Sequence, residues 1–172
     1  EKKSLKGIVS LVRVEDFSAG VVLPHEETLS KAKKDRFELM KATNCNFSQI
    51  YSLYIDENGE TQKRIERLSA GTPCYEFSDG LVTHRLWIVN DKMALEAFRA
   101  EFASRKLYIA DGHHRYETAI NYRNYCRENA VWAPGSEFVM MMLVDMAHPG
   151  LVVFPTHRLV RDFENFDAEK VL

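Results

Sequence analysis

Cysteine is scarce in this sequence, and long apolar runs are missing. The three cysteines among its 172 residues, Cys45, Cys74 and Cys126, are widely separated and form no Cys-x-x-Cys pair. This spacing argues against a disulfide framework and a structural zinc site, and it fits a reducing cytoplasm. No stretch approaches the roughly 18 to 20 apolar residues of a membrane helix, and the start lacks the apolar core of a secretory signal. We therefore expect a soluble, cytoplasmic protein without a membrane partner.

An excess of charge of one sign is also missing. The formal net charge is −2, with 28% charged and 45% hydrophobic residues. This composition is ordinary for a globular protein and gives no reason to expect nucleic acid as a partner. The first residue is not Met, and Asp167 looks like the N-cap of a helix that the sequence end cuts off. We expect residues 1–172 to form a single α+β domain that is a fragment of a longer protein.

Several common catalytic signatures are absent. The sequence contains no Gly-x-x-x-x-Gly-Lys-Ser/Thr loop, no Gly-x-Gly-x-x-Gly fingerprint and no nucleophile-elbow pattern. The standard nucleotide-binding folds and hydrolases that use a serine or cysteine nucleophile are therefore not indicated. Any chemistry has to come from other groups.

The pattern of apolar residues predicts alternating strands and helices. Strands are expected at 7–14, before Pro24, and at 50–55, 74–77, 81–89, 107–110, 138–144 and 151–154; helices are expected at 26–42, 61–70, from an N-cap at Asn90 through 102, and from 112 to about 128. The residues from Leu86 to Val89 look core-facing on both sides of their strand. This order indicates one α+β domain with a mixed sheet and flanking helices.

The junction of a strand and a helix near residue 111 carries the densest group of chemically active side chains. Asp111 is expected to be the helix N-cap, and Gly112 allows an unusual backbone angle or a close ligand approach. His113, His114 and Arg115 should then project from the first helical turn. The amides of that turn and the positive end of the helix dipole favour an anion, and Arg115 adds a bidentate group for phosphate.

Two other interpretations of this junction stay open. A capped strand–turn–helix with solvated His side chains is a common structural feature. A metal site is the second alternative, using Asp111 with His113, or His113 with Glu117 four residues later. His113 and His114 are poor joint ligands because adjacent helical residues point about 100° apart.

Two further segments carry candidate groups. Thr156, His157 and Arg158 follow a predicted strand and would strengthen an anion pocket if they converged on the first site. Glu26 and Glu27 stand at a predicted helix start after Pro24, where carboxylates also suit the helix dipole, and either is a candidate general base.

The stretch Tyr108-Ile-Ala-Asp-Gly-His-His-Arg-Tyr-Glu-Thr-Ala119 resembles a bacterial and archaeal family of unknown function, domain-of-unknown-function family number 1015. The resemblance covers most of the chain. The other matching segments are 22–30, 35–36, 41–43, 46–48, 50–51, 53–54 and 155–160. Members of that family are about twice this length.

The Asp-Gly-His-His-Arg element is also similar to that of free serine kinases in the ParB/sulfiredoxin-like superfamily. The resemblance implies that residues 111–115 bind nucleotide phosphates, with ATP or ADP and Mg²⁺ as cofactors. Asp111, His113 and His114 would then be catalytic, and Gly112, His113, His114 and Arg115 would bind the phosphates. Thr156, His157 and Arg158 belong only to the resemblance to family number 1015, and their chemistry adds them to the phosphate-binding group. The chemistry of Glu26 adds it to the catalytic group. The expected function is a nucleotide-dependent phosphotransferase acting on a small metabolite such as serine.

Two alternatives of other classes accompany this expectation. The first is a non-enzymatic nucleotide- or anion-binding regulatory module. The second is a metal-dependent enzyme that uses His113 and His157. Sulfiredoxin chemistry is disfavoured because that reaction needs a cysteine in the phosphate-binding motif, where this chain has Gly112 and His113.

Overall fold

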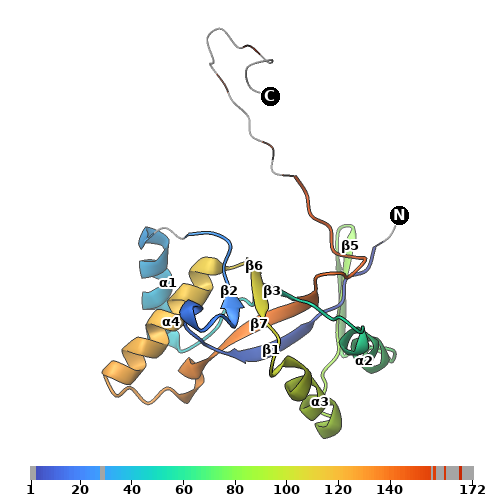
Figure 1. The fold of residues 1–172 in the computed structure, drawn as a ribbon, viewed down its shortest axis with the longest axis horizontal. Coiled ribbons are helices and arrows are strands. Elements are labelled where there is room, and N and C mark those ends of the chain that lie inside the picture. Colours follow the sequence, from blue (N-terminus) through green and yellow to red (C-terminus); the bar gives the residue numbers. More distant parts are fainter. Residues whose placement is uncertain (1–2, 28–29, 156, 158–160, 162–166, 168–172) are drawn as a thin grey trace.

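A five-stranded sheet lies at the centre of the computed structural model, which describes residues 3–27, 30–155, 157, 161 and 167 (Figure 1). The strands lie in the order β1 (Ile8–Arg13), β7 (Phe138–Asp145), β3 (Ile50–Tyr54), β6 (Leu107–Asp111) and β2 (Val22–Leu23). β1 with β7 and β3 with β6 are antiparallel, whereas β3 with β7 and β2 with β6 are parallel. The predicted α+β class with a mixed sheet is therefore confirmed.

Alternation along the central strands builds the core. In β3, the side chains of Ile50, Ser52 and Tyr54 are buried while their neighbours are partly exposed. Because successive strand residues point to opposite faces, this pattern assigns one face of β3 to the core. The core cluster comprises Val14, Val22, Ile50, Tyr54, Leu107, Ile109, Tyr116, Ala119, Val139, Met141 and Leu143.

Helices α1 (Ser30–Thr43) and α4 (His113–Glu128) pack together on one side of the sheet (Figure 1). The buried residues of α4 recur every three or four positions, as a helix with one core-facing side requires, and include Tyr116, Ala119 and Cys126. Arg123 is also buried. Its guanidinium donates to the carbonyl of Val14 at 2.7 Å and to Asp16 at 2.9 Å, so α4 is fixed to the chain after β1.

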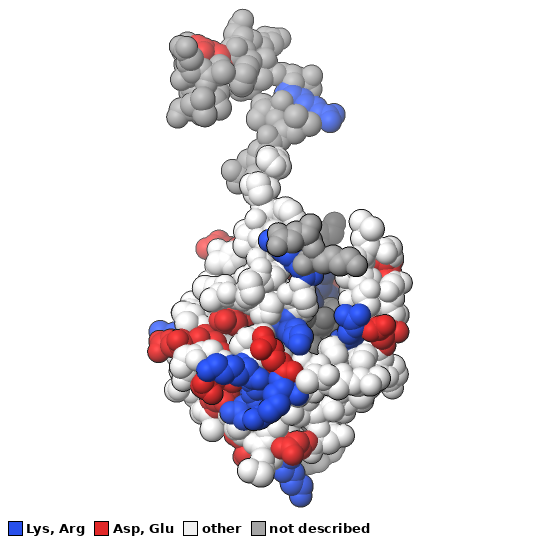
Figure 2. Space-filling model, turned by 90° about the vertical axis from the view of Figure 1, so that its right-hand side faces the viewer, with Lys and Arg blue, Asp and Glu red and all other residues white. Residues whose placement is uncertain are grey.

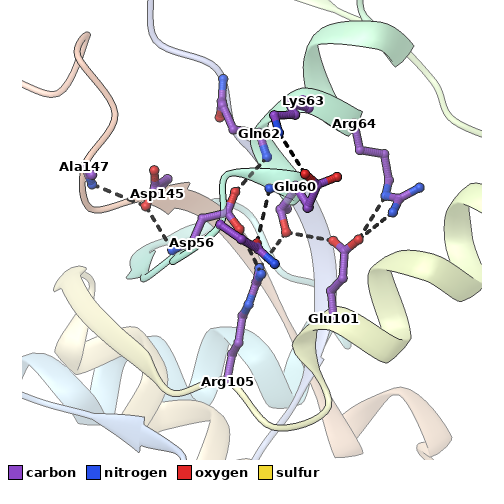
Figure 3. Close-up of polar contacts among 11 residues, drawn as sticks. Asp56, Glu60, Gln62, Lys63, Arg64, Glu101, Arg105, Asp145 and Ala147 are labelled. Carbon is purple, nitrogen blue, oxygen red and sulfur yellow. Dashed lines mark hydrogen bonds and ion pairs between the residues drawn. The ribbon is translucent and has the colours of Figure 1, made fainter.

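Helices α2 (Glu60–Leu68) and α3 (Lys92–Phe102) lie on the opposite side in Figure 1 and are held by a polar network (Figure 3). Asp56, which follows β3, accepts hydrogen bonds from the amide of Gln62 and from Arg105, each at 2.9 Å. Glu101 of α3 in turn accepts from Thr61 at 2.7 Å and from Arg64 at 2.6 Å, both in α2. These contacts join α2, α3 and the chain after β3 to one another.

The hairpin of β4 (Tyr75–Asp79) and β5 (Val82–Leu86) forms a separate two-stranded sheet. Every residue of both strands is exposed, and Leu86 is 48% exposed. β5 ends at Leu86, Ile88 is exposed, and Trp87 and Val89 are only partly buried, so the prediction that Leu86 to Val89 face the core on both sides was wrong. Their apolar character misled the prediction because apolar side chains also occupy much of a normal protein surface.

Three other local predictions need correction. The N-cap of α3 is Asp91, one residue after the predicted Asn90, and its carboxylate accepts a hydrogen bond from the amide of Ala94 at 2.7 Å. Residues 151–155 form no strand, and Val153 is 86% exposed. The described part of α1 begins at Ser30, and residues 25 and 26 form a bend rather than helix. Short 3-10 helices span Phe17–Ala19 and Pro134–Glu137.

The surface drawn in Figure 2 carries Lys and Arg side chains interspersed with Asp and Glu. No single sign dominates this face. Among the described residues, no helix has the length and apolar content needed to span a membrane. The three cysteines are free thiols, with Cys45 and Cys74 exposed and Cys126 buried.

Candidate functional site

The strand-to-helix junction predicted from the sequence is present. β6 ends at Asp111, and α4 begins at His113 after the N-cap residue Gly112, whose φ is 102°. This left-handed angle strains any residue with a Cβ, which explains the glycine. The prediction that Asp111 is the N-cap was wrong by one residue, because the chain reverses direction at the glycine that follows it.

The guanidinium of Arg115 lies directly over this turn. A Cβ added to Gly112 would come within 3.0 Å of the guanidinium carbon of Arg115. The first intrahelical donor of α4 is the amide of Tyr116, which bonds to the carbonyl of Gly112 at 3.0 Å. By helix geometry, the amides before it have no acceptor within the helix. Positive charge therefore gathers at the start of α4.

Arg115 is held by protein groups in this structure. Its guanidinium donates to the carboxylate of Asp111, to the carbonyl of Gln49 and, at 3.1 Å, to the hydroxyl of Ser48. These contacts fix the end of β6 to the loop before β3. A direct contact between Arg115 and phosphate stays a prediction, and so does the assignment of Gly112 to phosphate binding.

A second group of side chains meets the junction from a distant part of the sequence. Because β2 and β6 are parallel neighbours, the residues after β2 lie beside the residues after β6. His25 and Glu26 follow β2, and His113 follows β6. The Nδ1 atom of His113 lies 2.9 Å from Oε1 of Glu26, and the rings of His25 and His113 meet edge to face with centroids 4.4 Å apart.

The side chain of His113 is 1% exposed, whereas that of Glu26 is 54% exposed. Nε2 of His113 accepts a long hydrogen bond of 3.3 Å from the amide of His25. Its Nδ1 atom is at ion-pair distance from Glu26 but has no hydrogen bond of proper direction with any described residue. Burial lowers the pKa of His113, and the Glu26 carboxylate opposes this effect only in part. The imidazole is therefore neutral near pH 7.

His25 is the functional candidate that the sequence argument missed. Its Nδ1 atom lies 2.8 Å from the carbonyl of Ile109. A carbonyl only accepts, so Nδ1 carries the proton and Nε2 keeps a lone pair for another group. The signal in the sequence was a histidine directly before the candidate base Glu26, at the end of a short strand.

The other predicted residues are placed differently. His157 is exposed and makes no hydrogen bond or ion pair with a described residue, while Thr156 and Arg158 lie outside the described residues. Residues 152–155 extend away from the sheet and its helices (Figure 1). Glu27 is exposed, and His114 is partly buried in the first turn of α4. Of the predicted site residues, the structure thus brings together Glu26 and the turn at 111–115.

This arrangement offers an exposed carboxylate, a neutral buried imidazole and a helix N-terminus at one edge of the sheet. Such a set can accept a proton from a substrate hydroxyl, bind an anion or hold a metal ion.

Comparison with known proteins gives one match. A family model described as "Protein of unknown function (DUF1015)" covers residues 1–172. Searches of curated proteins and of solved structures found no match. The family match confirms the resemblance to family number 1015 noted in the sequence. The chain therefore belongs to the DUF1015 family.

Proposed function

We propose that this protein is a nucleotide-dependent phosphotransferase similar to the free serine kinases of the ParB/sulfiredoxin-like superfamily. It binds the phosphates of ATP or ADP at residues 111–115 and transfers a phosphoryl group to a small hydroxyl-bearing metabolite such as serine. The proposal includes a cytoplasmic location, with the nucleotide and the metabolite as partners and no membrane partner.

The position of Glu26 carries the proposal. Glu26 and His113 are 87 positions apart in the sequence, yet Oε1 of Glu26 lies 2.9 Å from Nδ1 of His113, the first residue of α4. A phosphoryl transfer to a hydroxyl needs a carboxylate to take the hydroxyl proton close to the phosphate-binding groups. Glu26 meets this requirement, and its 54% exposure leaves it open to a substrate.

The groups present fit the proposed cofactors. Gly112 itself places no side chain at the start of α4, and the guanidinium of Arg115 lies 3.0 Å from where its Cβ would be, so a phosphate bound at this turn would meet that guanidinium. Asp111 keeps 75% of its side-chain surface exposed, and a carboxylate of this kind is an oxygen ligand that Mg²⁺ prefers. Bound magnesium would neutralise charge on the phosphate oxygens.

Titration calorimetry with ATP, ADP and CTP, followed by phosphorus NMR with serine and magnesium present, tests the proposal. Binding followed by formation of a phosphomonoester supports it. Binding without turnover supports the second candidate, a nucleotide-binding regulatory module. Absence of binding by every nucleotide contradicts both.

The variant Glu26→Gln tests the role of the carboxylate. We expect turnover to fall by at least about 100-fold, since a positioned general base contributes about this much, while nucleotide affinity changes little. Glu27→Gln is the matched control because Glu27 is the adjacent exposed carboxylate, and its turnover should be unchanged. Equal losses in both variants, or full activity of Glu26→Gln, would remove Glu26 from the mechanism.

A further inference from the structure

The cluster of His25, Glu26 and His113 has the composition of a metal site. One donor atom from each residue can be chosen so that all three lie within 4.8 Å of one another. A tetrahedral zinc site holds its donors about 3.4 Å apart, so the exposed side chains of His25 and Glu26 need only a small movement. Their exposure permits it.

The protonation of the two imidazoles suits metal binding. The contact between Nδ1 of His25 and the carbonyl of Ile109 leaves Nε2 as the donor atom, and such an outer hydrogen bond is typical of metal-binding histidines. His113 presents Nδ1, which lacks a hydrogen bond of proper direction to any described residue although the side chain is almost completely buried. The Glu26 carboxylate 2.9 Å away is not aligned for a hydrogen bond with this atom, and a metal ion held between the two groups would bind both.

Binding at Nδ1 has one identifiable cost. The ring proton of His113 has to move to Nε2, so the 3.3 Å hydrogen bond from the amide of His25 is lost. That bond is long and weak. Three coordination bonds replace it.

The donor set selects the kind of ion. Two imidazoles and one carboxylate are ligands of zinc and of similar transition metals, whereas magnesium prefers oxygen donors. Three protein ligands also leave one coordination position open for water or substrate. We propose that His25, Glu26 and His113 bind one zinc-type divalent ion with an open coordination position. This ligand set differs from the pairs expected from the sequence, since it combines His113 with two residues that follow β2.

The proposed site has a consequence for the phosphotransferase, and this part alone rests on the proposed function. A metal-bound Glu26 no longer accepts a proton. Occupancy by a zinc-type ion therefore inhibits transfer, while magnesium at the nucleotide does not compete for the histidines. The site would act as a regulatory metal site.

Cobalt and zinc binding to the chelator-stripped full chain tests the proposal without any nucleotide. We expect one equivalent of Co²⁺ to give the visible absorption of a four-coordinate ion, and one equivalent of Zn²⁺ to remove it. His25→Ala and Glu26→Gln should each weaken Zn²⁺ affinity in calorimetry by at least about tenfold. Both residues are exposed at the surface, so these variants should keep the fold.

His157→Ala and Glu27→Gln are the matched controls and should bind Zn²⁺ as the unmodified chain does. The proposal is overturned if the unmodified chain binds no transition metal, if His25→Ala binds zinc normally, or if His157→Ala loses affinity equally. None of these results touches nucleotide binding, and a protein that binds zinc but no nucleotide would contradict the proposed function alone.

Discussion

Two fully buried tyrosines illustrate how much a single hydroxyl depends on its surroundings. The hydroxyl of Tyr116 accepts from the amide of Glu15 at 3.0 Å and donates to the carbonyl of Glu15 at 2.8 Å. The hydroxyl of Tyr54 is buried to the same extent but has no hydrogen-bond partner among the described residues. A buried polar group without a partner costs about 1–3 kcal/mol, so the two side chains should respond oppositely to loss of the oxygen.

We expect Tyr54→Phe to leave the free energy of unfolding unchanged or to raise it by about 1 kcal/mol, because no hydrogen bond is lost. Tyr116→Phe should lower it by about 1–3 kcal/mol, because two groups of Glu15 lose their partner. Denaturant unfolding measures both values. A Tyr54→Phe protein that is clearly less stable would mean that this hydroxyl does have a partner.

The same residues predict the response to alkaline pH. Burial raises the pKa of both Tyr54 and Tyr116 above the usual value near 10. Above pH 10 the unfolded chain therefore loses these protons first, so stability is complete below pH 10 and falls as pH rises toward the folded-state values. Tyr54→Phe should make this fall less steep. An unchanged slope of stability against pH between 9 and about 11 would contradict the assignment.

For single residues, the sequence predicted the need for glycine at position 112, but it did not predict that His25 lies in the candidate site. The conformational demand at Gly112 is local, because it follows from a strand and a helix that are adjacent in the chain. The role of His25 depends on a ring contact with His113, which only the pairing of β2 with β6 creates. Local patterns contain no information on that pairing.

Among the elements, α2 and α3 depend most on polar contacts. The Asp56 side chain is completely buried, and its ion pair with Arg105 at 2.9 Å joins the chain after β3 to the segment between α3 and β6 (Figure 3). The hairpin β4–β5 also contains an ion pair, between Arg85 and Glu76, but each side chain is 50% exposed. Because the first ion pair is buried and the second is exposed, breaking the first should lower the free energy of unfolding more than breaking the second.

Asp56→Ala should lower the free energy of unfolding by about 3–5 kcal/mol, because it leaves the Arg105 charge and the Gln62 amide without their acceptor. Glu76→Ala, the matched control, should change it by less than about 1 kcal/mol. Thermal and denaturant unfolding can both measure the difference. Similar losses in the two variants would show that burial does not decide the strength of these pairs.

Most elements were predicted within a few residues, including α2, α3 and the exposed hairpin, whereas the strand expected at 151–154 is absent. β6 and α4 were predicted because Ile109, Tyr116 and Ala119 carry the apolar spacing of a buried strand and helix. The segment 151–154 is as apolar as a strand, but it has no neighbouring strand to pair with among the described residues. An apolar run alone does not determine whether a partner strand exists.

At the scale of the whole molecule, the segment before β1 and the turn after β7 contact each other at Gly150. A Cβ placed on Gly150 would lie 1.9 Å from the carbonyl oxygen of Ser4, which is far too close for any side chain. Gly150 also donates its amide to Nδ1 of the buried His148 at 2.9 Å. The first described segment therefore crosses the turn after β7 in direct backbone contact.

Gly150→Ala should destabilise the protein by about 1–3 kcal/mol, because the backbone of residue 4 or 150 has to move. Gly71→Ala is the control, since no atom lies within 4 Å of its added Cβ and its backbone angle is ordinary, and it should change stability by less than about 1 kcal/mol. If calorimetry shows only a small loss of stability for Gly150→Ala, the backbone at residues 4 and 150 can move apart at little cost.

The sheet order itself lay beyond the sequence argument. The chain visits the strands in the spatial order β1-β7-β3-β6-β2, so neighbours such as β1 and β7 are more than 120 residues apart. The apolar pattern predicted a strand at 50–55, but not that β7 and β6 flank it. The candidate site depends on this order. β2 is the edge strand beside β6, and this pairing brings the residues after β2 next to the start of α4.

The contact between Ser4 and Gly150 makes circular permutation feasible. A short linker can join these two positions without crossing the body, and the chain can be reopened between Asp79 and Gly80, at the tip of an exposed hairpin. In such a rearranged protein, β1 would follow β7, its antiparallel neighbour, in the sequence. The two strands would then form a hairpin, so the pairing with the longest separation in the natural sequence would become local. Loops that close over fewer residues form faster, so the permuted chain should refold more rapidly than the natural one.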